Sequence, residues 1–313
     1  MTVLIVYCVF IAAASWAGGN APSLIRLTHA RMQLFVSLIG GFMLGIALFH
    51  MLPHAALETG SLDGVMLWMM IGLLTTFFLI RAFHFHQHAS AEHEDAACGH
   101  EPGHEHDHDH DHDHGGPAPA TRRQVSPEQE PGEATTSAGR RFNWIGMAAG
   151  LGIHSLLDGV AVAASVRSEA HSAPDGLLLG IGTAIAVFLH KPLDSMSIIA
   201  LMAAGGWSPA SRQVVNFGYA LLCPLGALAF WFGADPLAGG GQIFIGGALA
   251  FSAGVFLCIS LGDLLPEVQF HSHDRLKLSA CLVAGVLLAW TLRFFEPAHI
   301  HRASGMTGVE SRE

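Results

Sequence analysis

The sequence has little charge for its length. Of its 313 residues, only 13% are Asp, Glu, Lys or Arg, whereas 51% are hydrophobic and the mean hydropathy is +0.44. Soluble domains carry about 25% charged residues, so this chain falls well below them. Long apolar runs recur along the sequence, and a run of ~20 such residues is enough to cross a bilayer. The composition argues against an ordinary soluble enzyme and indicates a membrane protein.

Cysteine is also scarce, and its spacing carries no motif. None of the five cysteines belongs to a CxxC pair, so we expect neither a disulfide framework nor a zinc ribbon. The chain lacks the GxxxxGK[ST] pattern of a phosphate-binding loop, so ATP coupling is not indicated, and no nucleophile motif supports a hydrolase. We therefore expect no enzyme activity and no resident cofactor. The cysteines are Cys8, Cys98, Cys223, Cys258 and Cys281.

Eight hydrophobic segments are long enough to span a membrane. They predict an all-α, polytopic membrane protein, because each is near the ~20 residues that cross ~30 Å of hydrocarbon. A cleaved secretory signal is the alternative for the first segment, but no Lys or Arg precedes Arg26 and the apolar run is long. The expected spans are 2–25, 32–54, 62–82, 142–166, 176–203, 212–233, 241–267 and 276–296.

Basic residues predict the orientation of these spans in the bilayer. Cytoplasmic loops retain Lys and Arg, and an extracytoplasmic N-terminus places most of the 15 basic residues in such loops. We therefore expect a multi-pass cell-membrane protein with both termini extracytoplasmic. Its expected parts are helices 1–3 in residues 1–82, a cytoplasmic loop in 83–141, helices 4–8 in 142–296 and a short extracytoplasmic tail in 297–313.

The expected loop holds eleven of the 21 histidines and much of the acidity behind the net charge of -10. That acidity therefore describes one segment and not a surface that repels nucleic acid; we expect no nucleic-acid partner. The loop is too polar to bury a core, so we expect it to be disordered. Its HDHDHDHDH run alternates imidazole and carboxylate, which are good donors for borderline divalent cations, and it predicts metal binding. The expected donors are His104, His106, His108, His110, His112 and His114.

Spans two and seven contain an internal repeat. GFMLGIALFHMLPH at 41–54 aligns without gaps with GVFLCISLGDLLPE at 254–267. Since the two spans run in opposite directions in the expected topology, they predict an inverted repeat of the kind found in secondary transporters. The alternative is that two Leu-Pro motifs merely end two helices. The repeat predicts an outer pathway end at His50 and His54 and an inner end at Asp263 and Glu267.

Two matched pairs of polar residues lie in spans four and five. GIHSLLDG contains His154 and Asp158, and FLHKPLDS contains His190 and Asp194. Residues four apart share a helix face. An ionisable side chain at mid-membrane costs about 2.5–3.5 kcal/mol and usually faces a pathway or a partner. Two imidazoles and two carboxylates around one point predict a site for Zn(II), and also for Fe(II), Mn(II), Cd(II) or Ni(II).

These features together resemble the ZIP (Zrt/Irt-like protein) family of divalent metal-ion transporters. The resemblance covers the eight spans, the His-rich loop, the HSLLDG and HKPLDS stretches and the two Leu-Pro motifs. It implies uptake of Zn(II) or a similar ion into the cytoplasm, frequently by a homodimer, through an elevator-like movement against a scaffold that contains spans two and seven. It also implies that His154, Asp158 and Asp194 are metal ligands, with His190 one turn before Asp194.

The sequence departs from this family at the position of a second metal. Many relatives hold two adjacent metals, and the corresponding residues here are Ser155, Lys191 and Cys223. A protonated lysine has three donors and no acceptor, so it cannot ligate a metal. One hypothesis is that Lys191 replaces the second metal and balances Asp158 and Asp194 in a one-metal site. The competing hypothesis is that Lys191 repels the substrate and makes this a weak or non-transporting member. A third reading is a membrane metal sensor or buffer that acts through its His-rich loop.

Overall fold

The computed structural model of the chain describes residues 1–24, 29–91, 133–172, 178–237, 241–264, 275–292 and 294. Within these ranges the chain is helical and contains no strand. Among the described residues, seven helical segments are long and apolar enough to cross a membrane, and Leu276–Leu292 is a shorter apolar helix. Each of the eight expected spans overlaps one of these segments, which confirms an all-α, polytopic membrane protein.

Several spans are assembled from more than one helix. Span two consists of α2, the π-helix η1 and α3, span six consists of α7 and α8, and span seven consists of α9 and the π-helix η2. The elements are α1 (Thr2–Leu24), α2 (His29–Ile46), η1 (Ala47–Met51), α3 (Leu52–Thr59), α4 (Leu62–Ala91), α5 (Glu133–Ser172), α6 (Ile181–Ala204), α7 (Pro209–Ala220), α8 (Leu222–Leu237), α9 (Gly241–Ile259), η2 (Ser260–Leu264) and α11 (Arg275–Leu292).

Two helices are longer than the expected spans. α4 continues to Ala91, and α5 begins at Glu133, so both ends of the segment 83–141 are helical rather than disordered. Hydropathy locates the end of the apolar segment, whereas the helix itself continues until a residue such as Gly or Pro disfavours it. No Gly or Pro occurs in 83–91, and α5 begins directly after a Pro-Gly pair. The loop histidines from His104 to His114 lie outside the described residues.

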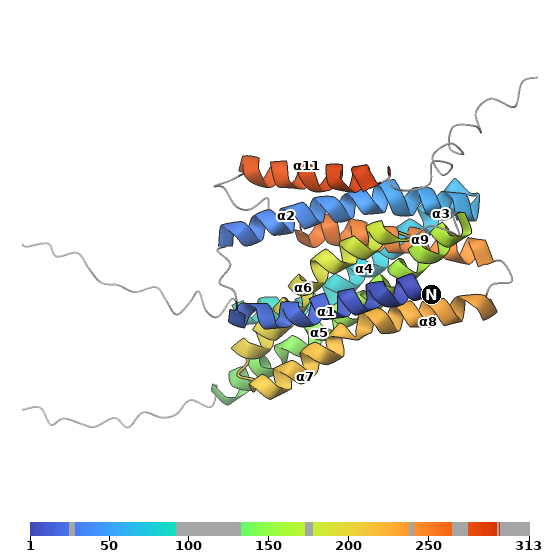
Figure 1. Cartoon of the computed structure of the whole chain (residues 1–313). Coiled ribbons are helices and arrows are strands. Elements are labelled where there is room, and N and C mark those ends of the chain that lie inside the picture. The colour runs from blue at the N-terminus through green and yellow to red at the C-terminus, as the bar shows by residue number, and fades with distance from the viewer. Residues whose placement is uncertain are drawn as a thin grey trace, which may run out of the picture.

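The inverted repeat has a structural signature at its polar end. The two π-helical segments of the described residues are η1 in span two and η2 in span seven, and they occupy equivalent positions in the 14-residue alignment. α2 and α9 run in opposite directions (Figure 1). A π-helical turn inside an α-helix is rare and occurs frequently at functional sites. The two repeated segments therefore share a local backbone structure, a π-helical turn, as well as a sequence pattern.

Glycine contacts extend this relation to the neighbouring helices. In helices α2, α4, α9 and α11, four glycines lie so close to a backbone carbonyl of the adjacent helix that a Cβ atom would collide with it. The contacts are Gly41 with Leu282 and Gly285 with Leu38 between α2 and α11, and Gly254 with Met69 and Gly72 with Phe251 between α9 and α4. Gly41 and Leu38 of α2 correspond to Gly254 and Phe251 of α9, and Gly285 and Leu282 of α11 correspond to Gly72 and Met69 of α4. The two residues of each corresponding pair are separated by the same number of positions in the sequence. α2 therefore packs on α11 as α9 packs on α4, through small residues that allow close approach in membranes.

The helices form two groups according to their packing. The repeat group contains α2, η1, α3, α4, α9, η2 and α11, and the site group contains α1, α5, α6, α7 and α8. In Figure 1, α11 and α2 lie at the top, and α7 and α8 at the bottom. Within the site group, Gly159 and Gly226 bring the backbones of α5 and α8 together, and Ser15 bonds Ser195 at 2.7 Å between α1 and α6. The groups meet chiefly where α5 lies against α9 and α4.

Candidate metal centre

Helices α5 and α6 bring the four expected ligand residues to one point. Each of His154, Asp158, His190 and Asp194 offers a ligand atom, and these four atoms all lie within 4.8 Å of one another. The first three residues are buried, and the Asp194 side chain is 15% exposed. The spacing of four residues within each helix turns both members of a pair to the same face, and the packing of α5 on α6 turns the two faces toward each other.

The distances between donor atoms match those of a small cation site. His154 Nε2 lies 3.2 Å and His190 Nε2 lies 3.3 Å from Asp158 Oδ2, and His154 Nε2 lies 3.8 Å from Asp194 Oδ2. In a tetrahedral zinc site with bonds of ~2.0–2.2 Å, neighbouring ligand atoms are about 3.3–3.6 Å apart. Two of the three separations fall near this value, and the third requires a small approach of Asp194.

A backbone contact fixes the orientation of the His190 ring. Its Nδ1 lies 2.7 Å from the carbonyl oxygen of Ala186, which can only accept, so Nδ1 carries the hydrogen. The Nε2 lone pair then points to the cluster, as in metal sites where the second ring nitrogen donates to a carbonyl. The His190 ring lies 5.5 Å from that of His154 and meets Phe256 of α9 edge-on at 6.1 Å.

Several polar atoms at the cluster have no hydrogen-bond partner in the described part of the chain. They are His154 Nδ1, Asp158 Oδ1 and Ser155 Oγ, and all are buried. An unsatisfied buried polar group costs about 1–3 kcal/mol, and such groups call for an explanation in a native structure. At the same point, the Nε2 atoms of two histidines lie against a carboxylate oxygen. An arrangement of lone pairs around one point is stabilised when a cation lies between them.

Lys191 lies directly on the cluster. Its fully buried ammonium contacts Asp158 Oδ2 and lies 3.0 Å from Asp194 Oδ2. With neutral imidazoles, two carboxylates and one ammonium leave a single negative charge. One divalent ion would change this charge to +1, and a second to +3, which is costly at a buried site. The other two expected second-site residues, Ser155 on α5 and Cys223 on α8, are buried in the site group.

Tyr219 belongs to the site, although the sequence patterns did not identify it. Its hydroxyl lies 3.2 Å from Asp194 Oδ2, to which it donates, and its ring lies 5.8 Å from the Lys191 Nζ atom. The residue comes from α7, two spans after the first ligand pair. One signal could have found it: the chain has only two tyrosines, and both lie in spans, where a hydroxyl needs a partner.

His50, one of the expected pathway residues, lies apart from the four-residue cluster. His50 is buried in η1 with Nε2 2.7 Å from the carbonyl oxygen of Ala289, and His54 is buried in α3. A Cβ atom on Gly182 of α6 would lie 3.7 Å from the His50 ring. Gly182 precedes His190 by eight residues, so His50 meets α6 about 12 Å from the cluster. The Asp263 side chain and Glu267 lie outside the part of the chain that can be described.

The chain is similar in sequence to known zinc transporters. The sequence model of a family described as "ZIP Zinc transporter" matches residues 1–293. The chain is 27% identical over 295 residues to zinc transporter ZIP4 of Homo sapiens, covering 85% of this chain and 43% of that protein. It is 30% identical over 139 residues to zinc transporter ZIP10 of Mus musculus, covering 44% and 15%. It is 28% identical over 291 residues to zinc transporter SLC39A7 of Rattus norvegicus, covering 76% and 59%. The chain thus spans less than half the length of the ZIP4 protein that it matches.

Proposed function

The chain belongs to the ZIP zinc transporter family, and we propose from this premise that it carries Zn(II) or a similar divalent cation across the membrane through the four-residue cluster. The observation that carries the proposal is the convergence of two imidazole Nε2 atoms and two carboxylates from α5 and α6 at one buried point. Imidazole and carboxylate suit zinc and neighbouring divalent ions. The cation is cargo and not a resident cofactor, and the family is one of transporters rather than of enzymes.

We propose that transport is directed into the cytoplasm. The distribution of basic residues supports an extracytoplasmic N-terminus, with the segment between α4 and α5 in the cytoplasm. In this orientation His54 and His50 lie on the entry side of the cluster. Asp263, Glu267 and the loop histidines lie on the exit side, where the loop receives the released ion.

We propose that the site group moves against the repeat group during transport. Two observations support such an elevator-like movement. Glycines hold α2 on α11, α4 on α9 and α5 on α8 by close backbone approach within each group. Between the groups, the ring contacts are apolar faces or edges, such as Phe230 with Phe244 and His190 with Phe256. A packed boundary that is mostly apolar, with the 3.5 Å contact of Glu58 and His171 as a polar exception, has few directional bonds to break when one group slides past the other.

We propose that the site holds one metal, with Lys191 in the place of a second. The support is the contact of its ammonium with both carboxylates and the single negative charge that remains. A fixed ammonium charge also neutralises part of the site between transport cycles, when no cation is bound. Ser155 and Cys223 complete this replaced site without supplying a carboxylate.

Zinc uptake by the full chain in liposomes tests the proposed function. The change is Asp158→Asn, which keeps the size of the side chain and removes a central ligand charge. We expect at least a tenfold loss of uptake, because the two histidines and Lys191 all contact this carboxylate. Asp63→Asn is the matched control, because Asp63 is exposed in the first turn of α4. Equal uptake by both variants would contradict the proposal.

Deletion of 92–132 separates transport from the sensor or buffer function. A transporter that uses the intramembrane site retains uptake after this deletion and loses it in His154→Ala. If the deletion abolishes metal-dependent behaviour and His154→Ala leaves it unchanged, the loop is the functional element and the helices only anchor it. The family resemblance also leads us to propose a homodimer. The total mass of protein in each nanodisc, compared with the mass of one chain, tests this.

A further inference from the structure

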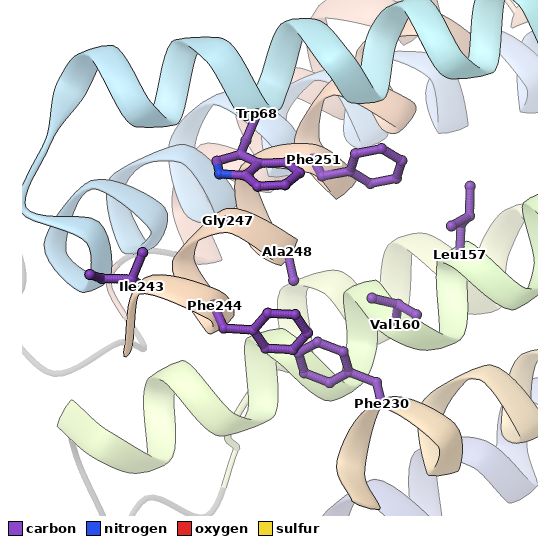
Figure 2. Close-up of a pocket in the computed structure, with 9 residues that line it drawn as sticks. All are labelled: Trp68, Leu157, Val160, Phe230, Ile243, Phe244, Gly247, Ala248 and Phe251. Atoms are coloured by element: carbon purple, nitrogen blue, oxygen red, sulfur yellow. The ribbon is translucent and has the colours of Figure 1, made fainter. Parts of the chain in front are cut away.

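An apolar cavity of about 560 Å³ lies between the site group and the repeat group (Figure 2). Its walls come from both groups. α5 and α8 form one wall, and α4 and α9 form the other. The side chains and backbone that line it belong to Trp68, Leu157, Val160, Phe230, Ile243, Phe244, Gly247, Ala248 and Phe251.

The lining is hydrocarbon apart from the indole N–H of Trp68. Figure 2 shows Trp68 and Phe251 on one side of the cavity and the Phe230 and Phe244 rings on the other. Those two phenylalanine rings stack at 5.5 Å with an interplanar angle of 11° and join α8 to α9. Ile243 is 62% exposed and Trp68 is 44% exposed, so the cavity continues into the surface that faces the bilayer. Its volume is that of a small-molecule site, within the usual ~300–1,000 Å³.

A cation stands above this cavity on the same face of α5. Arg167 follows Val160 by seven residues, which is two helical turns and about 10 Å along the axis. Its guanidinium carbon lies 4.7 Å from the ring centroid of Trp231, the neighbour of Phe230 in α8. α5 ends five residues later, at Ser172. Arginine and tryptophan near the end of a span occupy the depth of the lipid headgroups.

We propose that the cavity binds one acyl chain of a phospholipid and that Arg167 holds the phosphate of the same molecule. The apolar walls fit the chain, the opening toward the bilayer gives it access, and the charge of Arg167 is complementary to the headgroup. Since both helix groups form the walls, the bound lipid stabilises the arrangement of the groups seen here. The proposal rests on the membrane location of the chain and is independent of which ion it carries.

Photolabelling of the full chain in nanodiscs tests this site. The probe is a phosphatidylglycerol with a diazirine on one acyl chain, and labelled peptides are identified by mass spectrometry. We expect labelling of the α9 segment 243–251 to exceed that of α11 several-fold. Ala248→Phe fills the cavity and reduces the labelling of α9 at least fivefold. Val283→Phe, at a 52% exposed position of α11, is the matched control and leaves it unchanged.

A second probe tests the role of Arg167. A diacylglycerol with the same diazirine chain has no phosphate, so we expect it to label the cavity at least threefold less than the phospholipid does. Arg167→Gln removes this difference between the probes. If Ala248→Phe does not fold, as judged by its elution in detergent, Val160→Phe fills the cavity from the opposite wall.

Three results would overturn the proposal. They are equal labelling of α9 and α11, labelling of α9 that cavity-filling variants leave unchanged, and equal labelling by both probes in the unaltered chain. The readout is lipid contact and not zinc flux. A chain that fails to transport zinc therefore still gives a decisive answer here, and loss of lipid labelling does not contradict the proposed transport site.

Discussion

Replacing Lys191 by glutamine should change how many metal ions the site holds. The substitution removes the ammonium that contacts Asp158 and Asp194 and leaves two carboxylates without their internal cation. At 3.0 Å from Asp194 Oδ2, a unit charge contributes about 5 kcal/mol of gross attraction at an effective dielectric constant of about 20. Breaking a buried ion pair costs about 3–5 kcal/mol net. Lys191→Gln should therefore lower the free energy of unfolding by several kcal/mol in the absence of metal.

Zinc should raise the free energy of unfolding of the variant more than that of the unaltered chain. One ion at 100 times its Kd stabilises a protein by about 2.7 kcal/mol, and two independent ions by about twice that value. We expect one tightly bound zinc in a chain that lacks 92–132, and two in the same chain with Lys191→Gln, because the vacated charge admits a second cation. Thermal unfolding with and without zinc, together with elemental analysis, measures both quantities.

The matched control is Lys277→Gln in the first turn of α11, a lysine outside the four-residue cluster. It should change neither the stoichiometry nor the response to zinc. Two zinc ions in the unaltered site, or one ion in Lys191→Gln with no added stabilisation by zinc, would refute the reasoning. Absence of bound zinc in both chains would favour the weak or non-transporting member that Lys191 also allows.

Other parts of the structure give further predictions. Tyr219→Phe removes a hydroxyl that donates to Asp194, and a hydrogen bond to a charged group contributes about 1.5–3 kcal/mol. The zinc affinity, measured by competition, should therefore change by more than threefold. Tyr7→Phe is the control and should leave the affinity unchanged. Gly41→Ala and Gly254→Ala place equivalent Cβ atoms against backbone carbonyls, so each should lower the free energy of unfolding by about 1–3 kcal/mol. In the control Gly218→Ala, the new Cβ atom meets nothing within 4 Å and should not lower it. An equal effect at all three positions would contradict the repeat packing. Glu58→Gln removes the charge of a carboxylate that is 5% exposed and lies 3.5 Å from His171 of the other helix group. Because His171 is 47% exposed, the free energy of unfolding should fall by less than about 1 kcal/mol in thermal unfolding.

The position of the candidate site follows from short-range patterns in the sequence. His and Asp four residues apart must share a helix face, so two such pairs in consecutive spans predicted the neighbourhood of His154, Asp158, His190 and Asp194. The eight spans followed from the length of apolar segments alone. Both inferences depend on helix geometry that is the same in every protein, and for this reason the sequence was sufficient.

Features that depend on contacts between distant helices were not predictable in this way. Tyr219 reaches Asp194 only because α7 packs beside α6, and no spacing rule connects the two residues. The π-helical turns η1 and η2 arise inside segments whose composition is that of ordinary α-helix. The continuation of α4 and α5 beyond the apolar pattern is set by the absence of helix breakers, which hydropathy does not measure.

X-ray absorption at the zinc edge tests the central claim most directly, on a chain that lacks 92–132 and is loaded with one zinc. The account predicts a first shell of nitrogen and oxygen at ~2.0–2.2 Å that includes two imidazoles. His154→Ala should remove one imidazole, and Asp158→Asn should abolish tight binding. A sulfur ligand at ~2.3 Å, or a spectrum that neither substitution changes, would show that the ion is held elsewhere.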